Sequence, residues 1–261
     1  MKIKTDMRYL LKPLHILYVC YACLLFVALM IPVFIWSLIA LAFGRIRGGN
    51  LVYYGCIVWA DIWFFLVGIR HRNIYQEALD PQQSYIFVSN HISYLDSAII
   101  PKTFRRPVRP LGKVEMARIP IFGFIYRHAI VTVDRSSPTN RARSVEQLKQ
   151  VLRRGISILV FPEGTFNTTH QPLRDFYDGA FRIAIETGTP VKPVLLLDAY
   201  SRMHYSSIFT LNPGTSRALF LPAIGVEGLT PDDVATLREK VAGAMEAALV
   251  AHRAAWIENG A

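Results

Sequence analysis

The stretch SYIFVSNHISYLDSAIIPKTF, residues 84–104, passes directly from a β-rich run through a turn into a helical pattern. Its first six residues include the aromatic and β-branched side chains that favour a strand. Ser93 is followed by Asp96 at the spacing of a capping box, so we expect a helix that has Ser93 as N-cap and runs to Phe104. His91 then lies in the turn after the strand, where an open sheet exposes its functional residues.

The rest of the chain continues to alternate short strands with helices. Strands are predicted at Ser84–Ser89, Val108–Leu111, Ile130–Val133, Ile156–Phe161, Val191–Leu197 and Arg217–Leu221. Helices are predicted at Ser93–Phe104, Thr139–Arg153, Phe176–Thr187 and, opened by Thr-Pro-Asp-Asp, at Thr230–Trp256. This alternation predicts an α/β fold in which helices cover a mixed, largely parallel sheet.

Asp96 lies close enough to His91 in sequence to act on its side chain. A carboxylate on the first helical turn can fold back towards the imidazole, fix one ring nitrogen as a donor and leave the other as a proton acceptor. The same residues also fit a capped helix beside a surface histidine. The pair alone therefore leaves catalysis and structure as alternatives.

A second motif, FPEGT at residues 161–165, ends another predicted strand. Glu163 and the turn at Gly164 are thereby placed at the sheet edge where open α/β folds bind ligands. A glycine lets a ligand approach the backbone closely, and Glu163 and Thr165 offer polar groups for a hydroxyl-rich substrate. By itself, Pro-Glu-Gly is also an ordinary turn.

Together, Asn-His-x-x-x-x-Asp at residues 90–96 and Phe-Pro-Glu-Gly-Thr further along resemble the motifs of the glycerolipid acyltransferase family, which includes the 1-acylglycerol-3-phosphate acyltransferases. Weaker blocks of the family also match in order: Gly112-Lys113-Val114-Glu115, Ile119-Pro120 with Gly123, Val133-Asp134-Arg135 and Val191-Lys192-Pro193-Val194. The resemblance covers residues 84–197.

The resemblance implies direct acyl transfer from a thioester, with His91 as the general base and Asp96 as the residue that orients it. The implied acceptor is the sn-2 hydroxyl of 1-acylglycerol-3-phosphate, which would give phosphatidic acid. The implied donor is acyl-CoA or an acyl carrier protein, with neither a further cofactor nor a metal. General-base assistance of this kind contributes about 10²–10⁴-fold to a rate.

The residues implied for substrate binding are Lys113, Arg135, Glu163, Gly164 and Thr165, with the two cations matching positions for the acceptor's phosphate. Isolated cations are also common on protein surfaces, so Lys113 and Arg135 can alternatively be surface residues with no role in binding.

One position departs from the family's pattern. Phe166 and Asn167 follow Glu-Gly-Thr here, where the family often has Arg and Ser, so a phosphate-binding cation is missing. This leaves three interpretations: phosphatidic acid synthesis, acylation of another lysolipid or of glycerol-3-phosphate, and a non-catalytic membrane-tethered lipid-binding protein.

Residues 1–70 contain two apolar segments. No charged residue lies between Lys12 and Arg45, and Asp61 is the only one between Arg47 and Arg70. The first segment exceeds the roughly 20 residues that cross a bilayer core, and its length does not fit a cleaved signal peptide. We therefore predict an N-terminal two-helix membrane anchor at residues 1–70, followed by one catalytic domain at residues 71–261.

The charged residues that flank the two apolar segments do not fix how the anchor is oriented in the membrane. Basic residues precede the first segment, and Arg45 with Arg47 and Arg70 with Arg72 flank the second. A full hairpin crossing would put Arg45 and Arg47 on the far side, against the positive-inside tendency. A kinked or in-plane pair with every flank on the cytoplasmic face is the alternative. Either arrangement leaves the catalytic domain cytoplasmic.

The formal net charge of +10 is concentrated in residues 102–154, which hold thirteen Lys or Arg against three acids. Such a region is either a solvated face or a surface for anionic headgroups or an acidic partner. Nucleic acid is disfavoured because no recognition motif accompanies the charge. Cys20, Cys23 and Cys56 all lie in the apolar segments and form no disulfide or metal-binding pattern.

Overall fold

A computed structural model of the protein describes residues 2–133 and 138–257. The strands are β1 (Ile69–Tyr75), β2 (Ile86–Ser89), β3 (Arg109–Lys113), β4 (Val131–Val133), β5 (Ile158–Val160), β6 (Val191–Leu196) and β7 (Gly214–Phe220). The α-helices are α1 (Lys2–Ala40), α2 (Gly44–Leu66), α3 (Asp96–Thr103), α4 (Phe122–Ala129), α5 (Pro138–Arg153), α6 (Gly179–Thr187), α7 (Ala199–Arg202) and α8 (Val234–Ala251). Short 3₁₀ turns are η1 (Leu41–Phe43), η2 (Val114–Arg118), η3 (Ile208–Thr210) and η4 (Pro231–Asp233).

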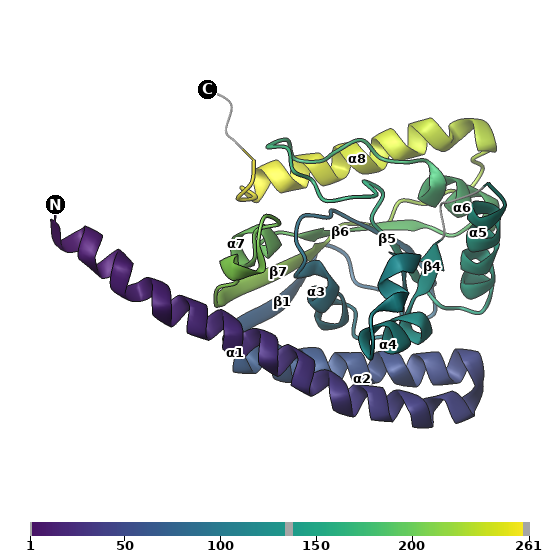
Figure 1. Ribbon diagram of the computed structural model, residues 1–261. Helices are drawn as coiled ribbons and strands as arrows, with labels where there is room; N and C mark the ends of the chain where they lie inside the picture. The colour runs from purple at the N-terminus through teal and green to yellow at the C-terminus, as the bar shows by residue number, and fades with distance from the viewer. Residues whose placement is uncertain (1, 134–137, 258–261) are drawn as a thin grey trace.

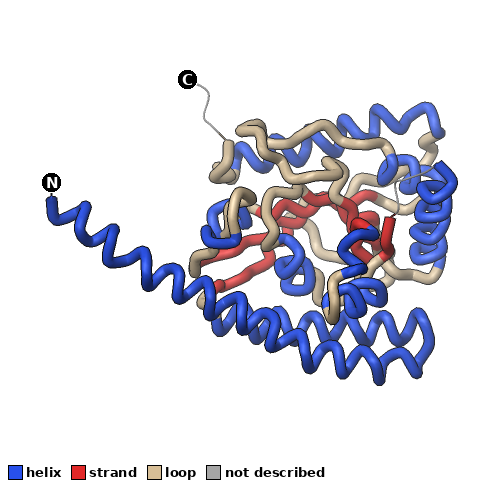
Figure 2. The backbone as a smooth tube through the Cα atoms, in the orientation of Figure 1, coloured by secondary structure: helices blue, strands red, loops and turns tan. Residues whose placement is uncertain are grey.

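The seven strands form one sheet in the order β1-β7-β6-β2-β5-β3-β4. Every pairing is parallel except that between β6 and β7, which confirms the predicted mixed, largely parallel sheet. The helices α5, α6 and α8 lie on one side of the sheet, and α3, α4 and the α1/α2 pair lie on the other (Figure 1). Figure 2 shows the strands as a twisted central layer between these helices.

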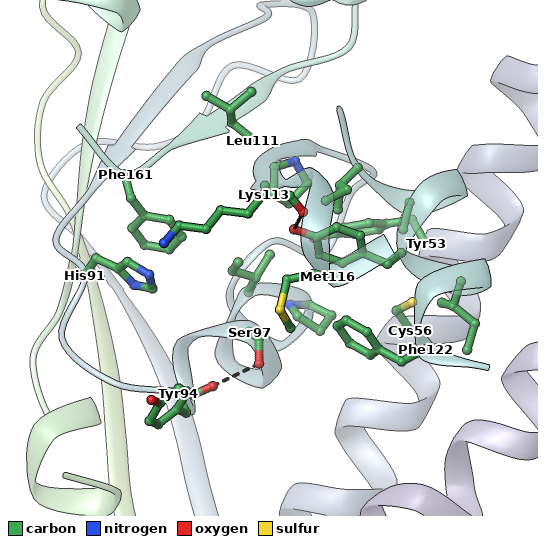
Figure 3. A pocket seen from close by; sticks show the side chains of 18 of the residues that line it. Tyr53, Cys56, His91, Tyr94, Ser97, Leu111, Lys113, Met116, Phe122 and Phe161 are labelled. Atoms are coloured by element: carbon green, nitrogen blue, oxygen red, sulfur yellow. Dashed lines mark hydrogen bonds between the residues drawn. The ribbon is translucent and has the colours of Figure 1, made fainter. Parts of the chain in front are cut away.

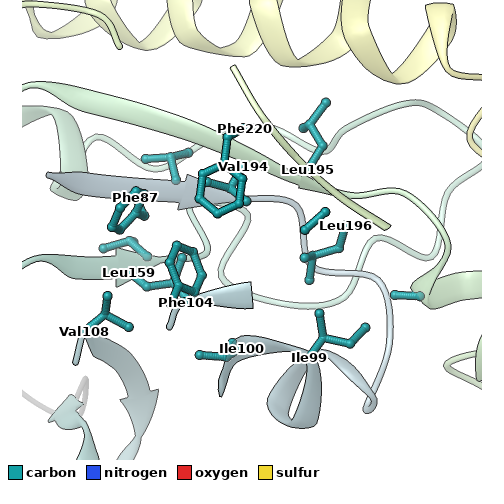
Figure 4. Close-up of a cluster of buried hydrophobic side chains, with 14 of the residues drawn as sticks. Phe87, Ile99, Ile100, Phe104, Val108, Leu159, Val194, Leu195, Leu196 and Phe220 are labelled. Atoms are coloured by element: carbon teal, nitrogen blue, oxygen red, sulfur yellow. The ribbon is translucent and has the colours of Figure 1, made fainter. Parts of the chain in front are cut away.

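The core lies on both faces of the central strands. All residues of β2, β5 and β6 are buried, as expected for parallel strands covered on both sides by helices. Phe87, Phe104 and Phe220 pack together with ring centroids 4.6–6.3 Å apart (Figure 4). This packing fixes β2 in the middle of the sheet.

Several elements depart from the sequence prediction, among them α4 and α7, for which no helix was predicted. The strand β1 was not predicted because Arg70 and Arg72 interrupt its apolar pattern; it is an edge strand, and exposed charges are common at edges. The predicted N-cap at Ser93 is wrong, since α3 begins at Asp96. In contrast, Thr230 is the N-cap at the start of the C-terminal helical region, as predicted, and it forms a capping box with Asp233.

The two predicted N-terminal helices are present and lie side by side (Figure 1). Indole N–H groups of α2 join them, because Trp59 and Trp63 donate to the carbonyls of Phe26 and Ala22 at 3.3 and 2.9 Å. The stretch Lys12–Leu66 is long and apolar enough to cross a membrane, judged by length and composition. Here these helices are called the hairpin.

The hairpin has an inner and an outer face. On α1, the residues Val19, Ala22, Met30 and Val33 are buried at helical spacing, whereas Leu17, Leu24, Ile31 and Ile35 are exposed. The only acid in the second apolar segment, Asp61, accepts hydrogen bonds from Lys102 at 2.7 Å and from both terminal nitrogens of Arg105. The domain therefore covers the inner face, and the outer face remains apolar and uncovered.

Candidate functional site

Three parallel strands carry the predicted motifs to one edge of the sheet. Val88 of β2 pairs with Val160 of β5, and β3 runs parallel to β5 on its other side. The turn with His91 follows β2, the turn with Gly164 follows β5, and Lys113 ends β3. Parallel neighbours end at the same edge, so residues far apart in sequence meet there.

The His91 ring and the Asp96 carboxylate are joined by a hydrogen bond of 2.8 Å between Nδ1 and Oδ2. The side chain of Asp96 is 1% exposed and that of His91 is 26% exposed. Because an ionised carboxylate can only accept, Nδ1 carries the proton and Nε2 is left as the proton acceptor. The structure thus brings the predicted pair together.

Asp96 is itself held by the turn that it closes. The same Oδ2 accepts hydrogen bonds from the backbone N–H groups of Ile92 and Ser93 at 2.9 and 3.0 Å. This is half of the predicted capping box. The other half is not formed, because the Ser93 hydroxyl accepts from the backbone N–H of Leu95 at 3.0 Å and not from that of Asp96, while it donates to the carbonyl of Met203. The Oδ1 atom is buried without a hydrogen-bond partner among the described residues. The turn therefore directs one carboxylate oxygen at the imidazole.

Aromatic side chains enclose the imidazole. Phe161 stacks on the His91 ring at a centroid distance of 4.2 Å, and Phe166 contacts it edge to face at 4.4 Å. Phe166 in turn packs on Tyr94 at 4.8 Å. The residue that replaces the expected arginine thus forms a wall of the site and restricts the orientation of the ring.

Glu163 lies behind the histidine. Its side chain is buried, and its two oxygens accept hydrogen bonds from the backbone N–H groups of His91 and Arg174 at 2.9 and 3.0 Å. Burial raises the pKa of the Glu163 carboxyl from 4.5 to about 7, the two amide donors lower it, and the charge of Asp96 adds a smaller rise. The carboxylate connects the two motif turns, and it does not line the cavity described next.

A cavity of about 560 Å³ opens beside His91, within the size range of ligand pockets. Phe26, Met30, Val33, Tyr53, Cys56 and Trp59 line it from the hairpin; Ile100, Leu111, Met116, Phe122, Ile125 and Phe161 are among its apolar residues from the domain. Figure 3 shows His91 at one side of this space and Tyr53, Cys56 and Phe122 across from it. The cavity is therefore a mainly apolar space with a proton acceptor at one end.

The remaining predicted residues differ in where they lie. Lys113, Gly164 and Thr165 line the cavity, and the Lys113 side chain extends towards Phe161 and His91 (Figure 3). Gly164 has φ 70°, a conformation that favours glycine and explains the residue at this turn. Arg135 lies outside the described residues.

Sequence reasoning missed the contribution of the hairpin to the cavity. The residues concerned, such as Met30 and Cys56, sit in uniformly apolar segments where nothing distinguishes a lining residue from a lipid-facing one. The position of the three cysteines in the apolar segments did not indicate that Cys56 lines a cavity. Only the packing of the helices on the domain identifies it.

Comparisons with known proteins agree with this geometry. The family described as Acyltransferase matches residues 71–197. The 1-acyl-sn-glycerol-3-phosphate acyltransferase alpha of Mus musculus is 31% identical over 186 residues, which are 69% of this chain and 64% of that protein. The 1-acyl-sn-glycerol-3-phosphate acyltransferase of Limnanthes douglasii is 26% identical over 223 residues, 84% of this chain and 76% of that protein. The match thus spans less than two thirds of the mouse relative.

A solved structure has the same fold. The crystal structure of the 1-acyl-sn-glycerophosphate (LPA) acyltransferase PlsC from Thermotoga maritima superposes with a TM-score of 0.72, over 96% of this chain and 100% of that one. The sequence identity is 19%, so the similarity establishes the α/β architecture and leaves the chemistry to the residues of the site.

Proposed function

We propose that the chain, which matches the acyltransferase family over residues 71–197, transfers a fatty acyl group from a thioester to the sn-2 hydroxyl of 1-acylglycerol-3-phosphate, giving phosphatidic acid. The observation that carries this proposal is the 2.8 Å hydrogen bond from His91 to Asp96 at one end of an apolar cavity. A base with an unprotonated nitrogen is joined there to a space suited to a lipid chain.

In the proposed reaction, Nε2 of His91 takes the proton of the acceptor hydroxyl as its oxygen attacks the thioester carbonyl carbon. The carbon–sulfur bond breaks, an ester forms, and the imidazolium returns the proton to the thiolate that leaves. Asp96 stabilises the imidazolium and keeps the ring in one tautomer. Glu163 acts as a positioning residue, since it holds the backbone of His91 and does not reach the cavity.

Few residues of the site indicate which headgroup the acceptor carries. Among the described residues that line the cavity, Lys113 is the only lysine or arginine, so we assign it to the phosphate. Arg135 remains a second proposed phosphate contact on the family's motif alone. Phe166 favours a runner-up acceptor, a lysolipid without a phosphomonoester, because it puts an aromatic ring where the family often has a cation.

The proposed donor is acyl-CoA or an acyl carrier protein, and the chemistry needs no cofactor beyond that thioester. Its acyl chain would occupy the apolar part of the cavity between the hairpin and the domain. Cavities of this kind bury most of a ligand's apolar surface, which favours long chains over short ones.

We propose that the hairpin lies in one leaflet rather than across the bilayer. The helices α3 and α4 pack against α2, and Phe124 of α4 contacts Phe34 of α1 at 5.1 Å, so the domain covers the inner face along the pair. A membrane-crossing hairpin would bring this polar domain into the hydrocarbon. In one leaflet, Arg45 and Arg47 stay on the cytoplasmic side with the other basic flanks.

A panel of acceptors and donors tests the proposed function. The purified full-length chain should acylate 1-acylglycerol-3-phosphate with a labelled acyl-CoA or acyl carrier protein, and His91→Ala should lower the rate by about 10²–10⁴-fold. The matched control is His170→Ala, which removes a histidine that does not line the cavity and should leave the rate close to that of the parent chain.

The panel also decides between the alternatives. Acylation of only a lysolipid without a phosphomonoester would replace the proposed acceptor. Activity of His91→Ala equal to that of the parent chain would remove His91 from the reaction. If the parent chain acylated none of the acceptors, the non-catalytic lipid-binding alternative would be favoured.

A further inference from the structure

The turn between η2 and α4 exposes apolar side chains beside the cavity. Residues 118–121 are consecutively exposed, with Ile119 at 45% and Ile121 at 40% of their maximal surface. Met116, just before them, is 39% exposed and also lines the cavity. Large aliphatic side chains grouped in this way mark an interaction surface more often than isolated ones do.

The backbone of this turn is held in an unusual conformation. Ile121 has φ 62°, which a β-branched residue rarely adopts. The N–H groups of Phe122 and Gly123 donate to the carbonyls of Pro120 and Ile119, both at 2.6 Å. A side chain at Gly123 would collide with the carbonyl oxygen of Ala117 at 2.4 Å. Such strain persists where the surrounding structure imposes it, often at ligand-binding sites.

The turn borders the same cavity as the hairpin. Met116 and Phe122, at its two ends, line the cavity together with Met30 and Cys56 of the hairpin. Figure 3 shows Met116 and Phe122 close to Cys56 and across from His91. The exposed turn therefore leads into α4, which packs on the apolar helices for which a membrane contact is proposed.

The charges around the turn suit anionic headgroups. Lys113, Arg118 and Arg127 are exposed near it, against one acid, Glu115. Within the part of the chain that the structure describes, none of the three cations forms an ion pair. Basic residues beside an exposed apolar group are the composition of a surface that binds at the membrane interface.

We propose that the η2/α4 turn is a second membrane contact, through which the lipid acceptor passes from the leaflet into the cavity. Ile119 and Ile121 enter the acyl region of the leaflet, and Arg118 and Arg127 meet its headgroups. This inference rests on the proposed acyl transfer for its kinetic test, whereas its binding test does not depend on any turnover.

The experiment compares Ile119→Glu and Ile121→Glu with the parent chain, in vesicles of phosphatidylcholine and phosphatidylglycerol. The control is Val250→Glu, an exposed aliphatic residue on α8, on the other side of the sheet from the hairpin (Figure 1). Vesicle co-sedimentation measures binding. Rates are measured with 1-acylglycerol-3-phosphate in the vesicles and with a short-chain acceptor of the same headgroup as monomers in water.

Both turn variants should weaken vesicle binding and lower kcat/KM for the vesicle-borne acceptor by about tenfold, since each replaces a membrane-buried isoleucine by a charge. The rate with the monomeric acceptor should stay within about twofold, because neither residue lines the cavity. Val250→Glu should match the parent chain in all assays.

Unchanged vesicle binding in both turn variants would overturn the inference. So would an equal loss with the monomeric acceptor, which would indicate disrupted packing, or an equal loss in Val250→Glu. Absence of turnover by the parent chain with either acceptor would count against the acyl transfer instead, and the co-sedimentation result would still decide the membrane contact.

Discussion

The two ends of the cavity are built on opposite principles. At the His91 end, directional hydrogen bonds hold the side chains: Asp96 accepts three hydrogen bonds through one oxygen, and Glu163 accepts two backbone donors. At the hairpin end, the wall consists mainly of apolar side chains such as Met30, Val33 and Cys56.

Because of this difference, the two ends of the cavity should tolerate amino-acid substitutions to different degrees. A directional hydrogen bond fails when one atom changes, whereas an apolar wall depends on volume and can be repacked by side chains of similar size. We therefore expect substitutions at the His91 end to act on the chemical step, and substitutions at the hairpin end to act on which acyl chains are accepted. Three predictions test that division.

The largest effect is expected for Asp96→Asn. The amide keeps the shape of the side chain and loses the charge that stabilises the imidazolium, so kcat should fall by about 10²–10⁴-fold while KM for the donor changes little. Steady-state kinetics across donors of several chain lengths measures this. A rate loss confined to long-chain donors would show that a substitution at the His91 end also changes which acyl chains are accepted, and would contradict the division between the two ends.

A smaller effect, about tenfold and dependent on chain length, is expected for Cys56→Phe, because the added ring fills part of the cavity that is proposed to hold the acyl chain. Rates with short-chain thioesters should be close to those of the parent chain. Cys20→Phe is the matched control, since Cys20 is exposed on α1 and does not line the cavity. Equal losses for short and long donors would contradict the assignment of the cavity.

The smallest effect is expected for Glu163→Gln, and it concerns the free energy of unfolding. Burial raises the pKa of Glu163 from 4.5 to about 7, so between these two pH values the folded chain holds a proton that the unfolded chain releases. The contribution of this group to the free energy of unfolding therefore falls as the pH rises through that window.

Glutamine does not titrate, so the free energy of unfolding of the parent chain relative to Glu163→Gln should decline by on the order of 2 kcal/mol across the same window. Denaturant unfolding in mild detergent at a series of pH values measures it. A constant difference between the two proteins would mean that Glu163 stays ionised when buried.

Much of the fold follows from local sequence patterns. The six predicted strands coincide with β2 to β7 apart from their ends, and the last helical region starts at the N-cap Thr230 as expected. Runs such as Ile158–Val160 and Val194–Leu196 are continuously apolar, and recognising them as buried strands needs no tertiary information. The edge strand β1 escaped detection because it pairs on one side only and tolerates exposed arginines at alternate positions.

The sequence by itself determined which residues belong to the site at the His91 end, since residues 90–96 and 161–165 each follow a strand and form short-range turns. Only the tertiary structure decided their detailed roles. The parallel pairing of β2 with β5 turned Glu163 towards the backbone of His91, and helix packing selected which apolar residues of the hairpin line the cavity. Hydrogen-bonded turns are local and are encoded by neighbouring residues, whereas a cavity is a property of surfaces that meet from distant segments.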